Sequence, residues 1–278
     1  MIRPSELLVR ATRYLDRHGV ESPRETAEVL LMDALGVDRA GLFSRREGVD
    51  AATARRLARA LSRRCAGTPV QYLTGRQQFL NLTLGVRPGV FIPRPETEGL
   101  VLAGLEVILD VPRPVVVDVG TGTGAIALAV KSARSDARVL ATDVSEAAID
   151  LARWNADRLG LDLEIMAGDL LSPLPPELRG HVDLVLSNPP YVDPEEFSTL
   201  SPEVRAEPAE ALIGGMLVHR RLAASAARWL CPGGWLFMEI GADQGTKARS
   251  LLERAFRDVE VLRDLAGRNR VVRGRLRG

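Results

Sequence analysis

Several residue types are scarce in this sequence of 278 residues, and each scarcity excludes a class of protein. Only two cysteines occur, Cys65 and Cys231, and they lie far apart without metal-ligand spacing. Neither a disulfide framework nor a cysteine metal site is therefore expected, and both thiols should behave as small buried hydrophobic groups. The three histidines are isolated from one another, so no ligand cluster for metal-dependent catalysis is expected.

Long hydrophobic runs are also missing. No apolar stretch reaches the roughly 18 residues of a membrane span, and the first ten residues lack the apolar core of a signal peptide. The hydrophobic content of 46% is nevertheless enough to fill the cores of one large and one small domain. We expect a cytoplasmic protein that does not contact a membrane.

Charge is nearly balanced overall, at a formal +1, but it is divided unevenly along the chain. Residues 1–90 carry 15 arginines against 9 acidic residues, whereas the remainder is net acidic. This asymmetry indicates either an acidic partner surface for the N-terminal part, protein or nucleic acid, or simply a solvated arginine-rich helix face. Both interpretations stay open. They apply to the same five arginines: Arg55, Arg56, Arg59, Arg63 and Arg64.

The chain divides into three regions. Residues 1–75 are predicted to be helical, 76–94 to form a β-hairpin linker around Asn81, and 95–278 to alternate strands with helices. Alternation of this kind is typical of a doubly wound α/β sheet. Within the first region, Ser22-Pro23-Arg24-Glu25 matches a capping box with proline at the first helical position.

The most informative tetrapeptide is Asn188-Pro189-Pro190-Tyr191, which follows an apolar run that predicts a buried strand, residues 182–186. The Asn188 side-chain oxygen and the Pro189 carbonyl can both accept hydrogen bonds, so together they can hold one NH2 group. Tyr191 offers a flat face for stacking on a planar amide or amine. Asn-Pro and Pro-Pro are also common in turns and loops, so the tetrapeptide alone does not distinguish a binding site from a turn.

A glycine-rich turn lies upstream, where a β-branched run ending at Val119 is followed by Gly120-Thr121-Gly122-Thr123-Gly124 and a helical segment. Glycines allow the backbone to approach a ligand closely, as in nucleotide-type sites. The spacing is G-x-G-x-G, and Ala127 occupies the place of the third glycine in the dinucleotide motif. The pattern therefore favours a nucleoside with a small charged tail over a pyrophosphate.

Acidic residues end the next two predicted strands. Asp143 closes residues 139–143, where its carboxylate can accept both hydroxyls of a ribose. Asp169 follows residues 163–167, where it can accept from an adenine amino group while Leu170 covers the ring. Four successive strand ends thus carry groups that suit a ligand, and all four are expected at one edge of the sheet.

These motifs resemble the seven-stranded S-adenosylmethionine-dependent methyltransferases. Further segments resemble, within that superfamily, the release factor glutamine N5-methyltransferases: residues 69–75, Phe91-Ile92-Pro93-Arg94-Pro95-Glu96-Thr97-Glu98, Met238-Glu239-Ile240-Gly241 with Gln244, and residues 264–270. The resemblance runs from about Leu7 to about Val272. It implies a Rossmann-like seven-stranded sheet, preceded along the chain by a small N-terminal helical domain. One segment departs from the family, because residues 213–217 are shorter than its usual glycine- and acid-rich loop, which leaves the local substrate contacts open.

The resemblance implies a function for each motif. S-adenosyl-L-methionine would be held by residues 120–124, Asp143, Asp169, Leu170 and Asn188, and Asn188-Pro189-Pro190-Tyr191 would hold the glutamine of a release factor, with Asn188, Pro189 and Tyr191 as the catalytic residues. No metal, nucleic acid or second subunit is implied, so a monomer is expected. Two rival functions remain: a DNA adenine-N6 methyltransferase, which uses a similar tetrapeptide on a flipped base, and a non-catalytic adenosine-binding module.

Overall fold

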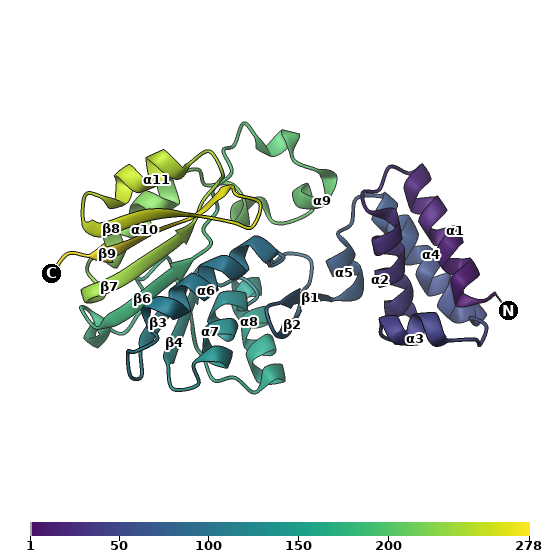
Figure 1. The fold of residues 1–278 in the computed structure, drawn as a ribbon, viewed down its shortest axis with the longest axis horizontal. Coiled ribbons are helices and arrows are strands. Elements are labelled where there is room, and N and C mark those ends of the chain that lie inside the picture. Colours follow the sequence, from purple (N-terminus) through teal and green to yellow (C-terminus); the bar gives the residue numbers. More distant parts are fainter. Residues whose placement is uncertain (1) are drawn as a thin grey trace. The chain divides into compact units, whose positions relative to one another are not determined.

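The computed structural model describes residues 2–278 and divides the chain into two compact units. The first unit contains the residues up to Arg76 together with Ser201–Ala206, and the second contains Gln77–Leu200 and Glu207–Gly278 (Figure 1). The chain therefore leaves the second unit once, for six residues, before it returns.

The first unit is helical, as the sequence predicts. Its helices are α1 (Pro4–Arg17), α2 (Pro23–Leu35), α3 (Arg39–Ser44), α4 (Ala51–Cys65), α5 (Val70–Thr74) and α9 (Pro202–Arg205). Apolar residues at helical spacing bury one face each of α1, α2 and α4 against the others, among them Leu8, Leu15, Leu30, Leu31, Leu57 and Leu61. Arg64, which is 5% exposed at the end of α4, forms an ion pair with Glu203 of α9.

The predicted capping box at the start of α2 is wrong. Pro23 does occupy the first turn, but Ser22 has φ +47° and its side chain caps nothing. A serine caps a helix from an extended backbone conformation, which aims its oxygen at the free N–H groups of the first turn. In the left-handed conformation the Ser22 side chain leaves that direction, and the backbone carbonyl of Ser22 accepts from Thr26 instead, at 3.0 Å.

The predicted hairpin is present as β1 (Arg76–Phe79) and β2 (Leu82–Gly85), a separate two-stranded sheet. Leu80 makes its turn with φ +49°, a conformation that leucine seldom adopts. Phe79, Leu82 and Leu84 are buried in the hydrophobic core of the large sheet.

The large sheet has seven strands in the order β5-β4-β3-β6-β7-β9-β8. The strands are β3 (Val115–Val119), β4 (Arg138–Asp143), β5 (Glu164–Ala167), β6 (Val182–Ser187), β7 (Leu230–Glu239), β8 (Phe256–Arg263) and β9 (Asn269–Leu276). Strands β3 to β7 are parallel, while β9 runs antiparallel to both β7 and β8. The predicted fold class, a Rossmann-like seven-stranded α/β sheet, is confirmed.

Helices cover both faces of this sheet (Figure 1). They are α6 (Glu98–Val107), α7 (Ala125–Ala133), α8 (Glu146–Leu159), α10 (Leu217–Ala226) and α11 (Gly245–Leu252), and the 3-10 turn η1 (Pro95–Thr97) leads into α6. One hydrophobic core joins α6 and α7 to one face of the sheet, and a second joins α10 and α11 to the other. The strand order reverses between β3 and β6, so the carboxyl ends of these neighbours flank the point where open α/β sheets bind ligands.

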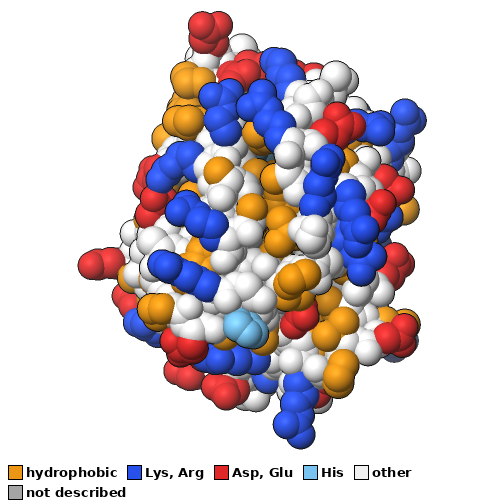
Figure 2. Space-filling model, turned by 90° about the vertical axis from the view of Figure 1, so that its left-hand side faces the viewer, with side chains coloured by type: hydrophobic (Ala, Val, Ile, Leu, Met, Phe, Trp, Pro, Cys, Tyr) orange, Lys and Arg blue, Asp and Glu red, His pale blue; other side chains and the backbone are white. Residues whose placement is uncertain are grey.

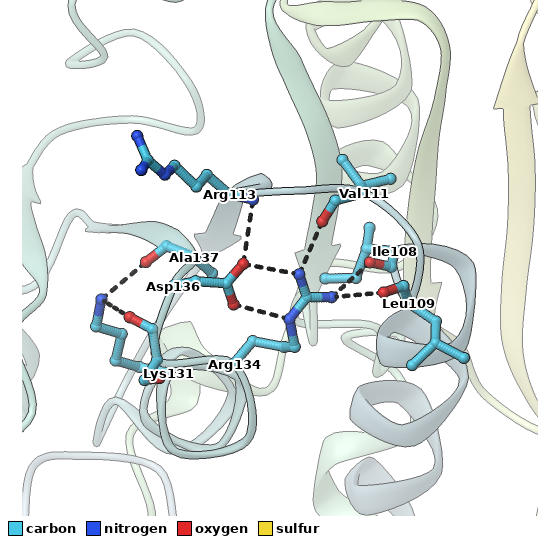
Figure 3. Close-up of polar contacts among 9 residues, drawn as sticks. Ile108, Leu109, Val111, Arg113, Lys131, Arg134, Asp136 and Ala137 are labelled. Carbon is cyan, nitrogen blue, oxygen red and sulfur yellow. Dashed lines mark hydrogen bonds and ion pairs between the residues drawn. The ribbon is translucent and has the colours of Figure 1, made fainter.

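A polar cluster around Arg134 fastens the C-terminal ends of α6 and α7 (Figure 3). The Arg134 guanidinium donates to the carbonyls of Ile108, at 2.6 Å, and Val111, at 2.7 Å, and it pairs with Asp136. The hydrogen bond from Arg134 holds the pKa of Asp136 below its usual range. Because free carbonyls at helix ends need donors, we assign this cluster a structural role.

On the face drawn in Figure 2, basic side chains lie among hydrophobic and uncharged surface, and most acidic side chains lie toward the rim. Among the described residues, no helix is both long and apolar enough to cross a bilayer. In the same part of the chain, residues 2–278, no group of three or more His, Cys, Asp or Glu side chains is arranged to hold a metal ion.

Candidate active site

The glycine-rich turn after β3 is open toward solvent. Gly120 has φ +73° and Gly122 has φ +55°, and a Cβ placed on either would meet nothing within 4 Å. Gly124 is different, because its Cβ would lie 3.0 Å from Leu128 and 3.3 Å from Ala152. Two glycines thus leave room beside the backbone for a ligand, and the third lets α7 start against α8.

Asp118, the residue before Val119, holds this turn from inside. It is fully buried, and its Oδ2 accepts from the Thr121 hydroxyl at 2.6 Å and from the Ala127 N–H at 3.2 Å, whereas its Oδ1 has no partner in the structure. Burial raises the pKa of Asp118 to about 7, against the effect of both hydrogen bonds. Sequence reasoning assigned no role to Asp118, although an acid two positions before the glycine-rich turn was a usable signal.

Asp143, at the end of β4, binds the same turn from the neighbouring strand. Its Oδ2 accepts from the Gly122 N–H and its Oδ1 from the Ser145 N–H, both at 2.9 Å. Each carboxylate oxygen has a further lone pair, so the two oxygens can still accept from a pair of vicinal hydroxyls. Ser145 also caps α8, since its side chain accepts a hydrogen bond from the Ala148 N–H.

Asp169 lies at the end of β5, where the sequence places it, but with a partner that the sequence does not reveal. Its carboxylate forms an ion pair with Arg221 of α10, and about half of each side chain is exposed. Leu170 has φ +51° and its carbonyl accepts from the Thr142 hydroxyl at 2.8 Å. A leucine held in the left-handed region stores strain, and such strain is concentrated at ligand sites.

Asn188 follows β6 directly, beside the glycine-rich turn of β3. Ser187 ties the two strand ends together, since its hydroxyl donates to the Val119 carbonyl at 2.7 Å. The Asn188 side chain is half-buried and donates through Nδ2 to the Thr97 hydroxyl at 3.1 Å. The structure therefore brings the ends of β5, β4, β3 and β6 to one edge of the sheet in that order.

Tyr191 is anchored at both ends. Its carbonyl accepts from Gln244 at 2.8 Å, and its hydroxyl donates to Oε1 of Glu239 at 3.3 Å. Burial raises the pKa of the Tyr191 hydroxyl above its usual range, and the charge of Glu239 adds to this effect. The phenol consequently remains neutral and acts as a donor.

Residues 91–98 connect the site to its surroundings. Glu207, nearly fully buried, accepts from the Ile92 N–H at 2.9 Å and forms an ion pair with Arg94. Burial raises the pKa of Glu207, while the Arg94 charge and these hydrogen bonds oppose the rise. Further along the segment, Glu98 accepts from the Leu80 N–H at 2.9 Å, and so holds the turn of the hairpin.

The short segment at residues 213–217 packs against the tetrapeptide. Val192 forms a parallel bridge with Ile213, and Gly214 donates to the Val192 carbonyl at 3.1 Å. A Cβ on Gly214 would lie only 2.4 Å from the Pro190 carbonyl oxygen. The segment that departs from the family pattern thus forms a close-fitting support for Pro190.

An adenosine-type ligand with a charged tail fits these groups. Open space beside Gly120 and Gly122, hydroxyl-accepting oxygens on Asp143 and the unpartnered buried oxygen of Asp118 are all features of the β3 and β4 ends. A parallel sheet of this strand order with β9 antiparallel, and a glycine-rich turn after its first strand, is the architecture of a methyltransferase.

The comparisons with known proteins agree with this class. Residues 83–268 match the family described as methyltransferase small domain, and residues 6–75 match the PrmC N-terminal domain. Release factor glutamine methyltransferases from Moorella thermoacetica and Mycolicibacterium smegmatis are 43% and 44% identical, over 95% of both chains for the first and over 98% of this chain and 97% of the other for the second. The chain belongs to the release factor glutamine methyltransferase family, which confirms the resemblance drawn from the sequence.

Two solved structures show the same fold at much lower identity. A 16S rRNA N2 G1207 methyltransferase from T. thermophilus has a TM-score of 0.55 at 23% identity, covering 73% of this chain and 50% of its own. The catalytic domain of hMettl16 has a TM-score of 0.56 at 13% identity and covers 82% of each chain. Their substrates differ, so they support the fold alone.

Proposed function

We propose that this chain transfers the methyl group of S-adenosyl-L-methionine to the side-chain amide nitrogen, N5, of the glutamine in the Gly-Gly-Gln tripeptide of peptide chain release factors. The observation that carries the proposal is Asn188-Pro189-Pro190-Tyr191 at the end of β6, next to the glycine-rich turn of β3. Relatives with more than 40% identity over nearly the whole chain bear the name of this activity.

The cofactor would be held by the ends of three strands. Gly120, Gly122 and the rest of the turn, residues 120–124, would lie along it, Asp143 would accept from its ribose hydroxyls, and Asp169 with Leu170 would lie at its adenine. When bound, S-adenosyl-L-methionine supplies an electrophilic methyl group on a positively charged sulfur, and S-adenosyl-L-homocysteine is the product. The pair between Asp169 and Arg221 would have to share the Asp169 oxygens with the adenine amino group.

The substrate amide would be held by acceptors. An amide nitrogen is a weak nucleophile because its lone pair is delocalised into the carbonyl. In our proposal the Asn188 side-chain oxygen and the Pro189 carbonyl accept its two N–H groups, Pro190 keeps the backbone rigid, and Tyr191 stacks on the amide plane. Positioning and fixed dipoles would then provide most of the rate enhancement.

The helical unit would dock the protein substrate. A single glutamine offers too few contacts for specificity, and residues 1–75 carry the excess of arginines. We propose three functional regions: docking by residues 1–75, a linker hairpin in residues 76–94, and methyl transfer by residues 95–278. We further propose that the protein works as a monomer in the cytoplasm without nucleic acid, where free thiols such as Cys65 and Cys231 persist.

The experiment is incubation of the protein with labelled cofactor and a release factor, followed by mass mapping of the modified peptides. The label is expected on the glutamine of the Gly-Gly-Gln tripeptide. Asn188→Ala is expected to lower kcat by about 10²–10³, as for the loss of an oxyanion-hole donor. Label on adenine in a DNA control instead of the release factor would replace the proposal by the DNA methyltransferase function, and binding without transfer would replace it by the non-catalytic one.

A further inference from the structure

A buried hydrogen-bond network connects Asn188 to a carboxyl group on the next strand. Asn188 Nδ2 donates to the Thr97 hydroxyl oxygen at 3.1 Å, and the Thr97 hydroxyl donates to Oε2 of Glu239 at 2.6 Å. Thr97 is 3% exposed and Glu239 is 1% exposed, so water does not compete for these bonds. We call these three residues the Thr97 network.

The number of protons in the Thr97 network fixes the orientation of the Asn188 amide. An ionised carboxylate can only accept hydrogen bonds, and a hydroxyl has one proton to donate. In the short 2.6 Å hydrogen bond, the Thr97 hydroxyl donates its single proton to Glu239. The Thr97 oxygen can therefore only accept from Asn188. The NH2 group of Asn188 must then face Thr97, and its oxygen must face the other way.

We propose that Thr97 and Glu239 are positioning residues, which act through Asn188 by holding its side-chain oxygen toward the substrate amide. The inference deepens the proposed methylation of glutamine and rests on it. The oxygen and NH2 ends of the Asn188 amide have nearly the same shape, so without the network either end could face the substrate. If the NH2 end faced it, a donor would meet the N–H donors of the substrate amide.

Tyr191 and the backbone of Glu239 complete the surroundings. The Tyr191 hydroxyl donates to Oε1, the other carboxylate oxygen of Glu239, at 3.3 Å. The aromatic ring proposed to stack on the substrate is therefore held by the same acid. His219 of α10 lies at 2.8 Å from the Glu239 carbonyl through Nε2, and burial lowers the pKa of His219. One carboxylate therefore orients both the Asn188 amide and the Tyr191 ring.

The orientation should depend on the protonation of Glu239. Burial raises the pKa of Glu239 to about 7, opposed by the Thr97 hydrogen bond, by the charge of Arg270 from β9 and by the Tyr191 hydroxyl, while Glu96 of η1 raises it further. Once protonated, Glu239 can donate to Thr97, the Thr97 hydroxyl becomes free to turn toward Asn188, and the Asn188 amide is no longer held in one orientation. Acid therefore loosens the Thr97 network.

Variants separate this role from simple packing. Thr97→Val keeps the shape and removes the hydroxyl. With release factor, kcat should fall 10- to 100-fold while the Kd for cofactor changes little; the Tm should fall as well, because buried Glu239 loses a hydrogen-bond donor. Thr97→Ser restores the hydroxyl and should recover turnover to within a few-fold of the wild type. Thr83→Val is the matched control on β2, because the Thr83 hydroxyl accepts a hydrogen bond from Gln78, at 2.8 Å, in the separate two-stranded sheet. Wild-type kcat in folded Thr97→Val would overturn the proposal while leaving the methylation of glutamine intact.

Nuclear magnetic resonance tests the network without any turnover. The side-chain NH2 signals of Asn188, assigned by their loss in Asn188→Ala, should shift with a midpoint near the pKa of Glu239, about 7. This titration should vanish in Glu239→Gln and in Thr97→Val. The NH2 group of Asn155, bound to the carbonyls of Gly85 and Thr123, is the internal control and should not move. An unchanged Asn188 titration in Glu239→Gln would overturn the proposal, even if the chain methylated a different substrate.

Discussion

Gly214→Ala adds one carbon atom directly against the backbone of the tetrapeptide. The added Cβ would lie 2.4 Å from the Pro190 carbonyl oxygen and 3.0 Å from Pro190 Cγ. Because carbon and oxygen atoms at ordinary contact are separated by more than 3 Å, the tetrapeptide or the segment at residues 213–217 must move by roughly 1 Å. Overpacking of this kind costs about 1–3 kcal/mol of stability.

The catalytic effect should be of a size similar to the effect on stability, because a tenfold change in rate corresponds to about 1.4 kcal/mol. A misplacement of about 1 Å in a positioned reactant can lower the rate about 10²-fold, and Pro190 lies directly between Pro189 and Tyr191. We expect Gly214→Ala to lower kcat by one to two orders of magnitude, with the Kd for cofactor nearly unchanged because the closest atoms to the new Cβ all belong to Pro190. Turnover with release factor and calorimetry with cofactor are the two measurements.

Gly99→Ala is the matched control, since a Cβ on Gly99 in α6 would meet nothing within 4 Å. Gly99 lies in the first turn of α6 and its Cβ would face open space, so this variant should keep the stability of the wild type to within about 1 kcal/mol and be fully active. If Gly214→Ala had the turnover of the wild type, the 2.4 Å contact would not constrain the tetrapeptide and the reasoning would be refuted.

Three further predictions follow from the same structure. Asp143→Ala should weaken cofactor binding by about 1–3 kcal/mol, because ribose hydroxyls and the Gly122 N–H lose their acceptor; calorimetry with an unchanged Kd would remove Asp143 from the site. Burial raises the pKa of Glu239 from 4.5 to about 7, so its contribution to folding stability is full below pH 4.5 and is lost as pH rises to about 7, by up to about 3 kcal/mol. Urea unfolding at pH 5 and pH 8 should therefore show a larger drop for the wild type than for Glu239→Gln, and equal drops would contradict the burial of this charge. A chain that starts at Gln77 should still bind cofactor but methylate the release factor poorly, whereas equal kcat/KM for the short and full chains would reject docking by the helical unit.

The parts of the site that lie in single strand ends could be predicted from the sequence. Short β-branched runs mark β3 and β6 as buried strands, and parallel strands bring their carboxyl ends to one edge, so the positions of Gly122, Asp143 and Asn188 followed from local pattern. Ser22 shows where prediction from local sequence fails. The residues of a capping box are present, but the Ser22 backbone adopts a left-handed conformation that prevents the cap.

The support behind the site could not be predicted in the same way. Thr97 and Glu239 are 142 positions apart, and nothing in the sequence near either residue shows that the two meet. The same is true of Arg221, which lies in α10, between β6 and β7, and pairs with Asp169 at the end of β5. Hydrogen bonds of this kind are set by how whole layers pack, so sequence motifs identified the segments without revealing what joins them.

The ion pair of Arg64 has a consequence for the order in which the protein forms during synthesis. The helices up to α5 leave the ribosome first, but Glu203, the counter-charge of the buried Arg64, belongs to a segment that completes the helical unit about 130 residues later. At about 5–20 residues per second, synthesis of that stretch takes roughly 6–26 s. During this interval the Arg64 guanidinium has to remain hydrated. The N-terminal unit is thus among the first parts to be translated, yet it can reach its final form only after most of the catalytic sheet exists.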